Sequence, residues 1–312
     1  PNGIWMEVDS WSPELQTGGT RGVFGGGSRP APSTRNVIDY ANLDSTGNFI
    51  DFGDLTVQRS QLGGTASRTR GLFIGGFFNP ATRNEIDFIT IASTGTCTDF
   101  GNLTQARTGC ASVSNGTRAV TMGGSVPSTV DIIDYVTIAQ TGNSVDFGNL
   151  TGSKRAEASA QSSTRGLAMG SYPGSGSTHL ASIDYITIAT LGNAADFGDL
   201  SSALSKNGGC SNSVRALSFG GDNGPSRVDT IDYLTIATLG DAIDFGDLTT
   251  ATQNLSAVAS PTRGVAAGGN TPDYVDVVEY VQIMSTGDAV DFGNLTVVKA
   301  EMGQVSNGHG GL

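Results

Sequence analysis

Three features of the sequence predict an all-β fold, a six-bladed β-propeller with four antiparallel strands in each blade. The first is a sequence motif that recurs at a mean period of 48 residues, which is typical of a propeller, solenoid or array. The second is a composition of 45 glycines with short runs of Val, Ile, Thr and Ser, typical of short strands joined by tight turns. The third is a variation in length that is confined to one segment of each unit. The recurring Asp-Phe-Gly triplets begin at Asp51, Asp99, Asp146, Asp196, Asp244 and Asp291.

Each unit is expected to supply four strands, here named A to D in chain order. Strand A is rich in small residues, as in 62–67, which suits the crowded centre of a ring. Strand B begins at an arginine and ends in Gly-Gly. Strand C carries Ile-Asp-Tyr and is apolar on both faces, as expected for a sheet packed on both sides. A turn containing glycine, such as 45–47, leads into strand D with its Asp-Phe-Gly.

The spacing between landmarks separates a constant scaffold from variable loops. The strand C acid lies 12 residues before the Asp-Phe-Gly aspartate in all six units, and that aspartate lies 19 residues before the next strand B arginine in all five cases. Only the interval from the arginine to the strand C acid varies, from 16 to 19 residues. Each B–C loop in this interval contains proline, which stiffens a loop and lowers the entropy lost on binding.

The two ends of the chain differ from the repeat. Residues 1–19 hold both tryptophans, Trp5 and Trp11, and match the repeat poorly, so we interpret them as a connector or docking arm, with the propeller covering 20–312. The first unit lacks a good strand A because Pro13 falls where one would run. We therefore expect the C-terminal segment, about 300–306, to complete blade 1 and close the ring, which removes sheet edges that would aggregate.

Composition excludes several classes of protein. A net charge of −12 disfavours a nucleic-acid partner, which would need a basic stripe. No apolar run approaches the roughly 20 residues that span a bilayer. Cys97, Cys110 and Cys210 share neither a repeat position nor a CxxC spacing, so we expect buried free thiols, with no disulfide framework, metal site or cofactor.

The order of these landmarks resembles the kelch-type β-propeller: Gly-Gly ending strand B, an acidic-aromatic strand C, then an aromatic residue on D followed by Leu and a basic residue. Here phenylalanine replaces the usual tryptophan of strand D, and Leu204 and Thr252 replace the basic residue in two units. The repeated motif Ile-Asp-Tyr-x-Thr-Ile-Ala resembles kelch-like repeats of virion and tail-fibre proteins of tailed phages. That resemblance implies a particle-surface or host-attachment protein.

The recurring acids on strands C and D leave three interpretations open. Six equivalent copies favour a structural role in which carboxylates accept hydrogen bonds from loop N–H groups. Cation binding and general acid–base catalysis are the alternatives. The strand C acids are Asp39, Asp87, Asp134, Asp184, Asp232 and Glu279. The repeat arginines, at the A–B turns, are expected to bond turn carbonyls or the next blade's C–D turn; a basic docking ring is the alternative.

The remaining candidates lie in the B–C loops, where large or charged residues interrupt Gly, Ser and Pro. Aromatic residues flanked by polar groups suit sugar stacking or protein contact. No Ser/His/Asp order, GxSxG, P-loop or HExxH motif is present, so no catalytic residue is predicted. The candidate ligand-binding residues are Arg29, Arg35, Phe77, Phe78, Arg83, Tyr172, His179, Asp222, Arg227, Asp273 and Tyr274.

These observations favour a non-enzymatic propeller on a virion or other extracellular assembly. We expect it to form part of a larger oligomer, attached to other assembly proteins through residues 1–19, and to recognise a host-surface glycan or protein through the B–C loops. One alternative is an enzyme that acts on polysaccharide through loop-face carboxylates. The other is an intracellular interaction scaffold.

Overall fold

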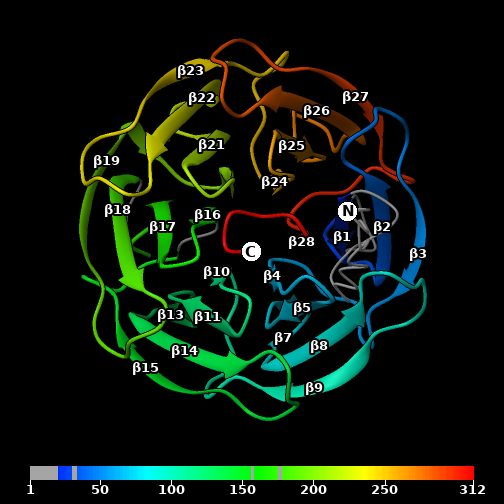
Figure 1. The fold of residues 1–312 in the computed structure, drawn as a ribbon, viewed down its shortest axis with the longest axis vertical. Coiled ribbons are helices and arrows are strands. Elements are labelled where there is room, and N and C mark those ends of the chain that lie inside the picture. The colour runs from blue at the N-terminus through cyan, green and yellow to red at the C-terminus, as the bar shows by residue number, and fades with distance from the viewer. Residues whose placement is uncertain (1–19, 30–33, 156–157, 175–177) are drawn as a thin grey trace, which may run out of the picture.

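The computed structural model describes residues 20–312 except 30–33, 156–157 and 175–177, and it confirms the six-bladed β-propeller. Six four-stranded antiparallel sheets stand around a central axis, and the described residues contain strands and turns but no helix (Figure 1). The predicted arm at 1–19, with Trp5 and Trp11, lies outside the described residues.

In every blade strand A is innermost and strand D outermost. Blade 1 contains β28 (Gly303–Ser306), β1 (Arg21–Gly25), β2 (Val37–Asn42) and β3 (Ile50–Asp54). Blade 2 contains β4 (Gly63–Ala66), β5 (Arg70–Ile74), β8 (Glu85–Thr90) and β9 (Thr98–Asn102). Blade 3 contains β10 (Ala111–Ser114), β11 (Arg118–Met122), β14 (Ile132–Thr137) and β15 (Val145–Asn149).

Blades 4 and 5 have the longest strands. Blade 4 contains β16 (Ala158–Gln161), β17 (Arg165–Ser171), β18 (Leu180–Thr187) and β19 (Ala195–Leu204). Blade 5 contains β20 (Gly208–Ser211), β21 (Arg215–Asp222), β22 (Arg227–Thr235) and β23 (Ile243–Asp247). Blade 6 contains β24 (Ser256–Ala259), β25 (Arg263–Ala267), β26 (Val277–Gln282) and β27 (Val290–Asn294).

Two short hairpins that the sequence did not predict lie in B–C loops. They are β6 (Phe77–Phe78) with β7 (Ala81–Thr82), and β12 (Ser125–Val126) with β13 (Ser128–Thr129).

The C-terminal strand closes the ring, as predicted. β28 pairs antiparallel with β1, with Val23 opposite Val305. The chain then continues into the centre of the ring (Figure 1). There the buried His309 bonds the Ala66 carbonyl at 2.7 Å, and the Gly310 N–H donates to the Ser211 carbonyl at 2.9 Å. One end of the chain thus ties blade 1 to blades 2 and 5.

The hydrophobic core is divided among the six junctions between neighbouring blades. At the junction of blades 1 and 2, for example, Phe52 and Leu55 pack with Leu62, Phe73 and Ile89. The three cysteines are free and buried in these clusters or beside them, as expected, and burial raises the pKa of each thiol. Each blade therefore depends on both neighbours for its apolar contacts.

The Asp-Phe-Gly motif joins each blade to the next. The phenylalanine side chain is buried, and its carbonyl accepts a hydrogen bond of 2.8–3.0 Å from the N–H of the glycine in the next blade's C–D turn. A second bond, such as Cys97 N–H to the Asp54 carbonyl, pairs the two segments. These inter-blade bonds cover the edge of strand D that an open sheet would expose. The first bonds join Gly95 to Phe52, Gly142 to Phe100, Gly192 to Phe147, Gly240 to Phe197, Gly287 to Phe245, and Gly47 to Phe292.

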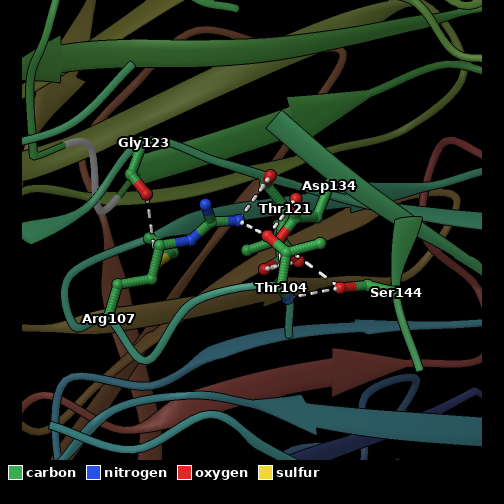
Figure 2. Close-up of polar contacts among 8 residues, drawn as sticks. Thr104, Arg107, Thr121, Gly123, Asp134 and Ser144 are labelled. Carbon is green, nitrogen blue, oxygen red and sulfur yellow. Dashed lines mark hydrogen bonds and ion pairs between the residues drawn. The ribbon is translucent and has the colours of Figure 1, made fainter. Parts of the chain in front are cut away.

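The strand C acids are structural, in agreement with the favoured interpretation. Thr104 and Arg107, in the connection from blade 2 to blade 3, bind Asp134: the Thr104 hydroxyl donates at 2.8 Å and the guanidinium at 2.9 Å (Figure 2). Both charged side chains are fully buried. The equivalent ion pairs are Arg59 with Asp87, Lys154 with Asp184, and Lys299 with Asp39. The strand D acids, in contrast, are exposed at all six positions.

The repeat arginines also act within the scaffold. Each is half-buried, lies over the aromatic ring of strand C in its own blade, and donates to a carbonyl at the next blade's C–D turn. Arg118, for example, lies 4.4 Å from the Tyr135 ring centroid and donates to the Ile188 carbonyl at 2.9 Å. The other bonds run from Arg21 to Ile91, Arg70 to Ile138, Arg165 to Ile236, Arg215 to Ile283 and Arg263 to Leu43. These contacts favour the structural interpretation over a basic docking ring.

Candidate functional site

The regular scaffold departs from its own pattern most clearly where blades 4 and 5 meet. In blade 4 the second glycine of the Gly-Gly pair is Ser171, and the B–C loop is the longest of the six. On the connection to blade 5, Leu204 occupies the position of the paired cation and extends β19 by pairing with Leu180. A site with one function is usually asymmetric, so this junction is the strongest candidate for such a site.

A cavity of about 300 Å³ opens at this junction, on the face of the B–C loops. Its walls come from the blade 4 loop, from the end of β21, and from the two connections that enter blades 4 and 5. The lining residues are Arg155, Ser171, Tyr172, His179, Ser205, Lys206, Asn207 and Asp222.

Backbone pairing holds the walls of the cavity in place. Arg155 and Tyr172 exchange two backbone hydrogen bonds of 2.9 and 3.0 Å, and Ser205 and Asp222 exchange two of 3.0 and 2.8 Å. Each pair joins a connection to the end of a B strand. The four side chains are therefore presented from paired backbone, which limits the entropy lost when a ligand binds.

Side-chain contacts fix the orientation of the polar groups. His179 Nδ1 and Ser205 Oγ share a hydrogen bond of 2.7 Å, and the rings of His179 and Tyr172 lie 6.2 Å apart between centroids. Lys206 donates to Asp222 Oδ2 at 2.8 Å, and the Gly224 N–H donates to Asp222 Oδ1 at 2.9 Å. Burial opposes ionisation of Asp222, but the bonds from Lys206 and Gly224 outweigh it and hold the pKa of this carboxyl below its usual value.

Of the predicted ligand-binding residues, the structure brings Tyr172, His179 and Asp222 together in this cavity. The others are spread over the same face. Arg227 lies opposite Asp222 in the β21–β22 ladder, and Arg83 forms an ion pair with Glu85. Phe77 and Phe78 form the short strand β6 in blade 2. Arg29 and Arg35 lie in blade 1, and Asp273 and Tyr274 in blade 6; of these four only Asp273 is exposed, while the other three are half-buried.

Five cavity residues were not predicted from the sequence. Arg155, Ser205, Lys206 and Asn207 belong to connections between blades, which the repeat identifies as constant scaffold. Ser171 interrupts the Gly-Gly pair, a departure that is visible in the sequence and points to this junction. Lys206 takes a left-handed backbone conformation with φ of 58°, like Gln61, Asn254 and Glu301 at equivalent positions.

Other hollows carry less chemistry. One of about 440 Å³ lies at the A–B turns of blades 2 and 3, beside Gly311 and Leu312. There Arg70 is already engaged by the Ile138 carbonyl and the Phe88 ring. Among the described residues, no group of three His, Cys, Asp or Glu side chains is placed to hold a metal ion. The same part of the chain contains no helix long and apolar enough to cross a membrane.

The cavity offers limited support for carboxylate catalysis. Glycoside hydrolysis by the usual route needs two carboxylates about 5 to 9.5 Å apart. Among the described lining residues Asp222 is the one carboxylate, and it is occupied by Lys206. The hydroxyl, aromatic and charged groups of the lining can hydrogen-bond and pack against a polar ligand.

No protein-family model matches the sequence, and no curated protein is detectably similar to it. The strand order in the ring is consistent with the kelch-type propeller that the sequence resembles.

Proposed function

We propose that this protein is a non-enzymatic binding propeller of an extracellular assembly, such as a virion surface or tail fibre, and that its B–C face contacts a surface glycan or protein. One observation carries the proposal: all six blade junctions share the backbone bond from the turn glycine to the Asp-Phe-Gly phenylalanine, whereas among the described residues a cavity of about 300 Å³ between blades 4 and 5 departs from the sixfold pattern on the loop face. A repeated scaffold with one distinctive polar cavity is suited to presentation and recognition.

Placement on an assembly is supported by the resemblance of the repeat to kelch-like virion and tail-fibre repeats. Residues 1–19, which do not match the repeat, are the proposed attachment to neighbouring proteins. The excess of acidic residues, with a net charge of −12, supports a surface role because like charges keep copies soluble and apart.

The proposal is tested by binding, with the chain as it exists. A glycan array and a cell-surface binding assay are run with the wild-type protein, with Tyr172→Ala in the cavity, and with Gln105→Ala at an exposed residue of the connection from blade 2 to blade 3. We expect the wild type and Gln105→Ala to bind and Tyr172→Ala to lose most binding. Recovered glycan should be intact, since the protein is proposed not to cleave it.

Two results would overturn the proposal. One is the absence of any glycan or cell-surface ligand together with purification as a free monomer that associates with no partner. The other is cleavage of the bound glycan, abolished by Asp222→Asn, which would replace the binding function with the enzymatic alternative.

A further inference from the structure

We propose that the cavity between blades 4 and 5 binds an acidic sugar, the carboxylate-bearing terminal unit of a glycan. This inference deepens the proposed function and rests on it. It commits the protein to one site and one ligand chemistry, and it is carried by the size, charge and shape of the cavity and by one buried hydroxyl.

The buried hydroxyl belongs to Ser171. The residue is 1 % exposed and lines the cavity, and its Oγ has no hydrogen-bond partner. Leaving such a group unpaired is costly, so an unpaired buried hydroxyl in a native cavity marks a place where a bound group completes the hydrogen bonding. In the other five blades a glycine occupies this position, with φ between 102° and 118°. The hydroxyl is therefore not a requirement of the fold.

The charge of the cavity favours an anion. Its described lining has two permanent cations, Arg155 and Lys206, against one anion, Asp222. This excess of positive charge stands in a protein whose net charge is −12. Lys206 is bound by Asp222, and arginine suits a carboxylate because its planar fork matches the two oxygens.

The remaining walls suit a sugar ring. Tyr172 and His179 form an aromatic side, with their rings tilted by 49°, against which the apolar face of a sugar can pack. The Ser171 and Ser205 hydroxyls lie on the same cavity and can bond sugar hydroxyls. A volume of about 300 Å³ is at the lower limit of small-molecule sites, which run from about 300 to 1,000 Å³. This size fits a single terminal unit and not an extended chain.

The test uses free monosaccharides as probes of the full chain. Titration calorimetry or ligand-observed NMR compares glucuronic acid with glucose, which has the same ring but no carboxylate, and glucose 6-sulfate as an anion of different shape. We expect glucuronic acid to bind at least tenfold more tightly than glucose and more tightly than the sulfate ester. Raising the salt concentration should weaken the binding of glucuronic acid and leave that of glucose unchanged.

Three variants locate the site. Tyr172→Ala should weaken glucuronic acid binding at least tenfold, and Ser171→Gly, which restores the residue of the other blades, should weaken it severalfold without loss of folding. Gln105→Ala, at an exposed residue in the connection from blade 2 to blade 3, should bind as the wild type does. Circular dichroism confirms that each variant is folded, so that a loss of binding is not a loss of structure.

The outcomes separate this inference from the proposed function. Equal affinity for glucose and glucuronic acid, stronger binding of the sulfate ester, or acid binding that survives both Tyr172→Ala and Ser171→Gly would overturn the acidic-sugar inference. A neutral glycan or a protein bound elsewhere on the B–C face would overturn it while the proposed binding function stands. A protein that binds no glycan, cell surface or partner would overturn both.

Discussion

At the scale of single residues, the glycine of Asp-Phe-Gly explains why the motif recurs in every blade. Gly101 has a φ of 146°, which side-chain-bearing residues rarely adopt, and a Cβ there would lie 2.3 Å from the Gly142 carbonyl oxygen in the next blade. Corresponding oxygens lie 2.3–2.6 Å from a Cβ built at the other five positions. The close approach that excludes a side chain is the approach that forms the inter-blade bonds.

Gly101→Ala should therefore lower the free energy of unfolding by about 1–3 kcal/mol, which is the cost of a strained backbone conformation. Gly142→Ala is the matched control, because it alters the other side of the same contact at a position where a Cβ meets no atom within 4 Å. Urea unfolding followed by circular dichroism measures both. Equal stabilities of the two variants would show that the contact at Gly101 relaxes without cost.

Asp134→Asn should cost about 3–5 kcal/mol, because it leaves the fully buried Arg107 guanidinium without its counter-charge (Figure 2). Asp146→Asn alters the residue opposite Asp134 in the same hairpin, which is exposed, and should change stability by no more than about 0.5 kcal/mol. Thermal or urea unfolding of the pair distinguishes a structural carboxylate from a solvated one. A small effect at Asp134 would contradict the role assigned to the buried ion pair.

Blade 5 shows what happens when the cation is missing in the native protein. Leu204 replaces it, Asp232 keeps its bonds from Ser201, and Asp232 Oδ1 is buried without a partner. Burial is the main reason that the pKa of Asp232 is raised, although the Ser201 bonds oppose the change. The sequence reveals the missing cation at 204, but the identity of its partner depends on which acid the connection meets in space.

At the scale of elements, the C-terminal segment after β28 acts as a plug in the central channel. His309 is 6 % exposed, and burial lowers its pKa from the usual 6.5 to about 4, with Arg68 adding to the effect and the Ala66 carbonyl opposing it. The folded state therefore holds this imidazole neutral at a pH where an exposed histidine takes up a proton.

This difference predicts a pH-dependent stability. Above pH 6.5 the imidazole is neutral in both states, and its contribution to stability is complete. As the pH falls from 6.5 to about 4, only the unfolded or released segment takes up the proton, so stability is lost, by up to about 3 kcal/mol. If only the C-terminal segment detaches while the ring stays folded, the loss of stability is smaller.

The measurement compares unfolding free energies of the wild type and His309→Asn across this pH range. The variant keeps a hydrogen-bond donor but cannot be protonated, so the difference between the two curves isolates the histidine. Parallel curves between pH 6.5 and 4 would contradict the prediction.

How far the sequence predicts these elements depends on whether they repeat. The strands and their order follow from the alternation of apolar and turn residues, and the C-terminal strand follows from the missing strand A of blade 1. The hairpins β6–β7 and β12–β13 were not predicted because they have only two residues per strand and lie in the variable loops. In the cavity, Tyr172, His179 and Asp222 were found because they stand out in their loops. Arg155 and Lys206 were missed because the cavity forms between segments that are distant in the chain.

At the scale of the whole molecule, stability depends on closure of the ring. The six core clusters lie between blades, and β28 joins the last segment of the chain to the first blade. A chain that ends after Met302 should leave the β1 edge unpaired, and such an edge favours association with other chains. A chain that ends after Asn307 keeps β28 and loses only the plug.

Size-exclusion chromatography with light scattering should therefore show the chain ending at Asn307 as the same species as the full chain. The chain ending at Met302 should form larger species or precipitate, and should unfold at a lower temperature. If both shortened chains behaved like the full chain, closure by β28 would not be needed for the ring.

The constant landmarks around each B–C loop have a consequence for engineering. Every loop leaves the sheet after a strand B that is held by its neighbours and returns on a strand C anchored by the buried acid, whatever the loop contains. Doubling the length of a flexible loop adds only about 0.6 kcal/mol of closure entropy. Loops could therefore be exchanged between blades or grafted from elsewhere as independent cassettes. The ring would then serve as a platform on which six recognition loops are varied one at a time.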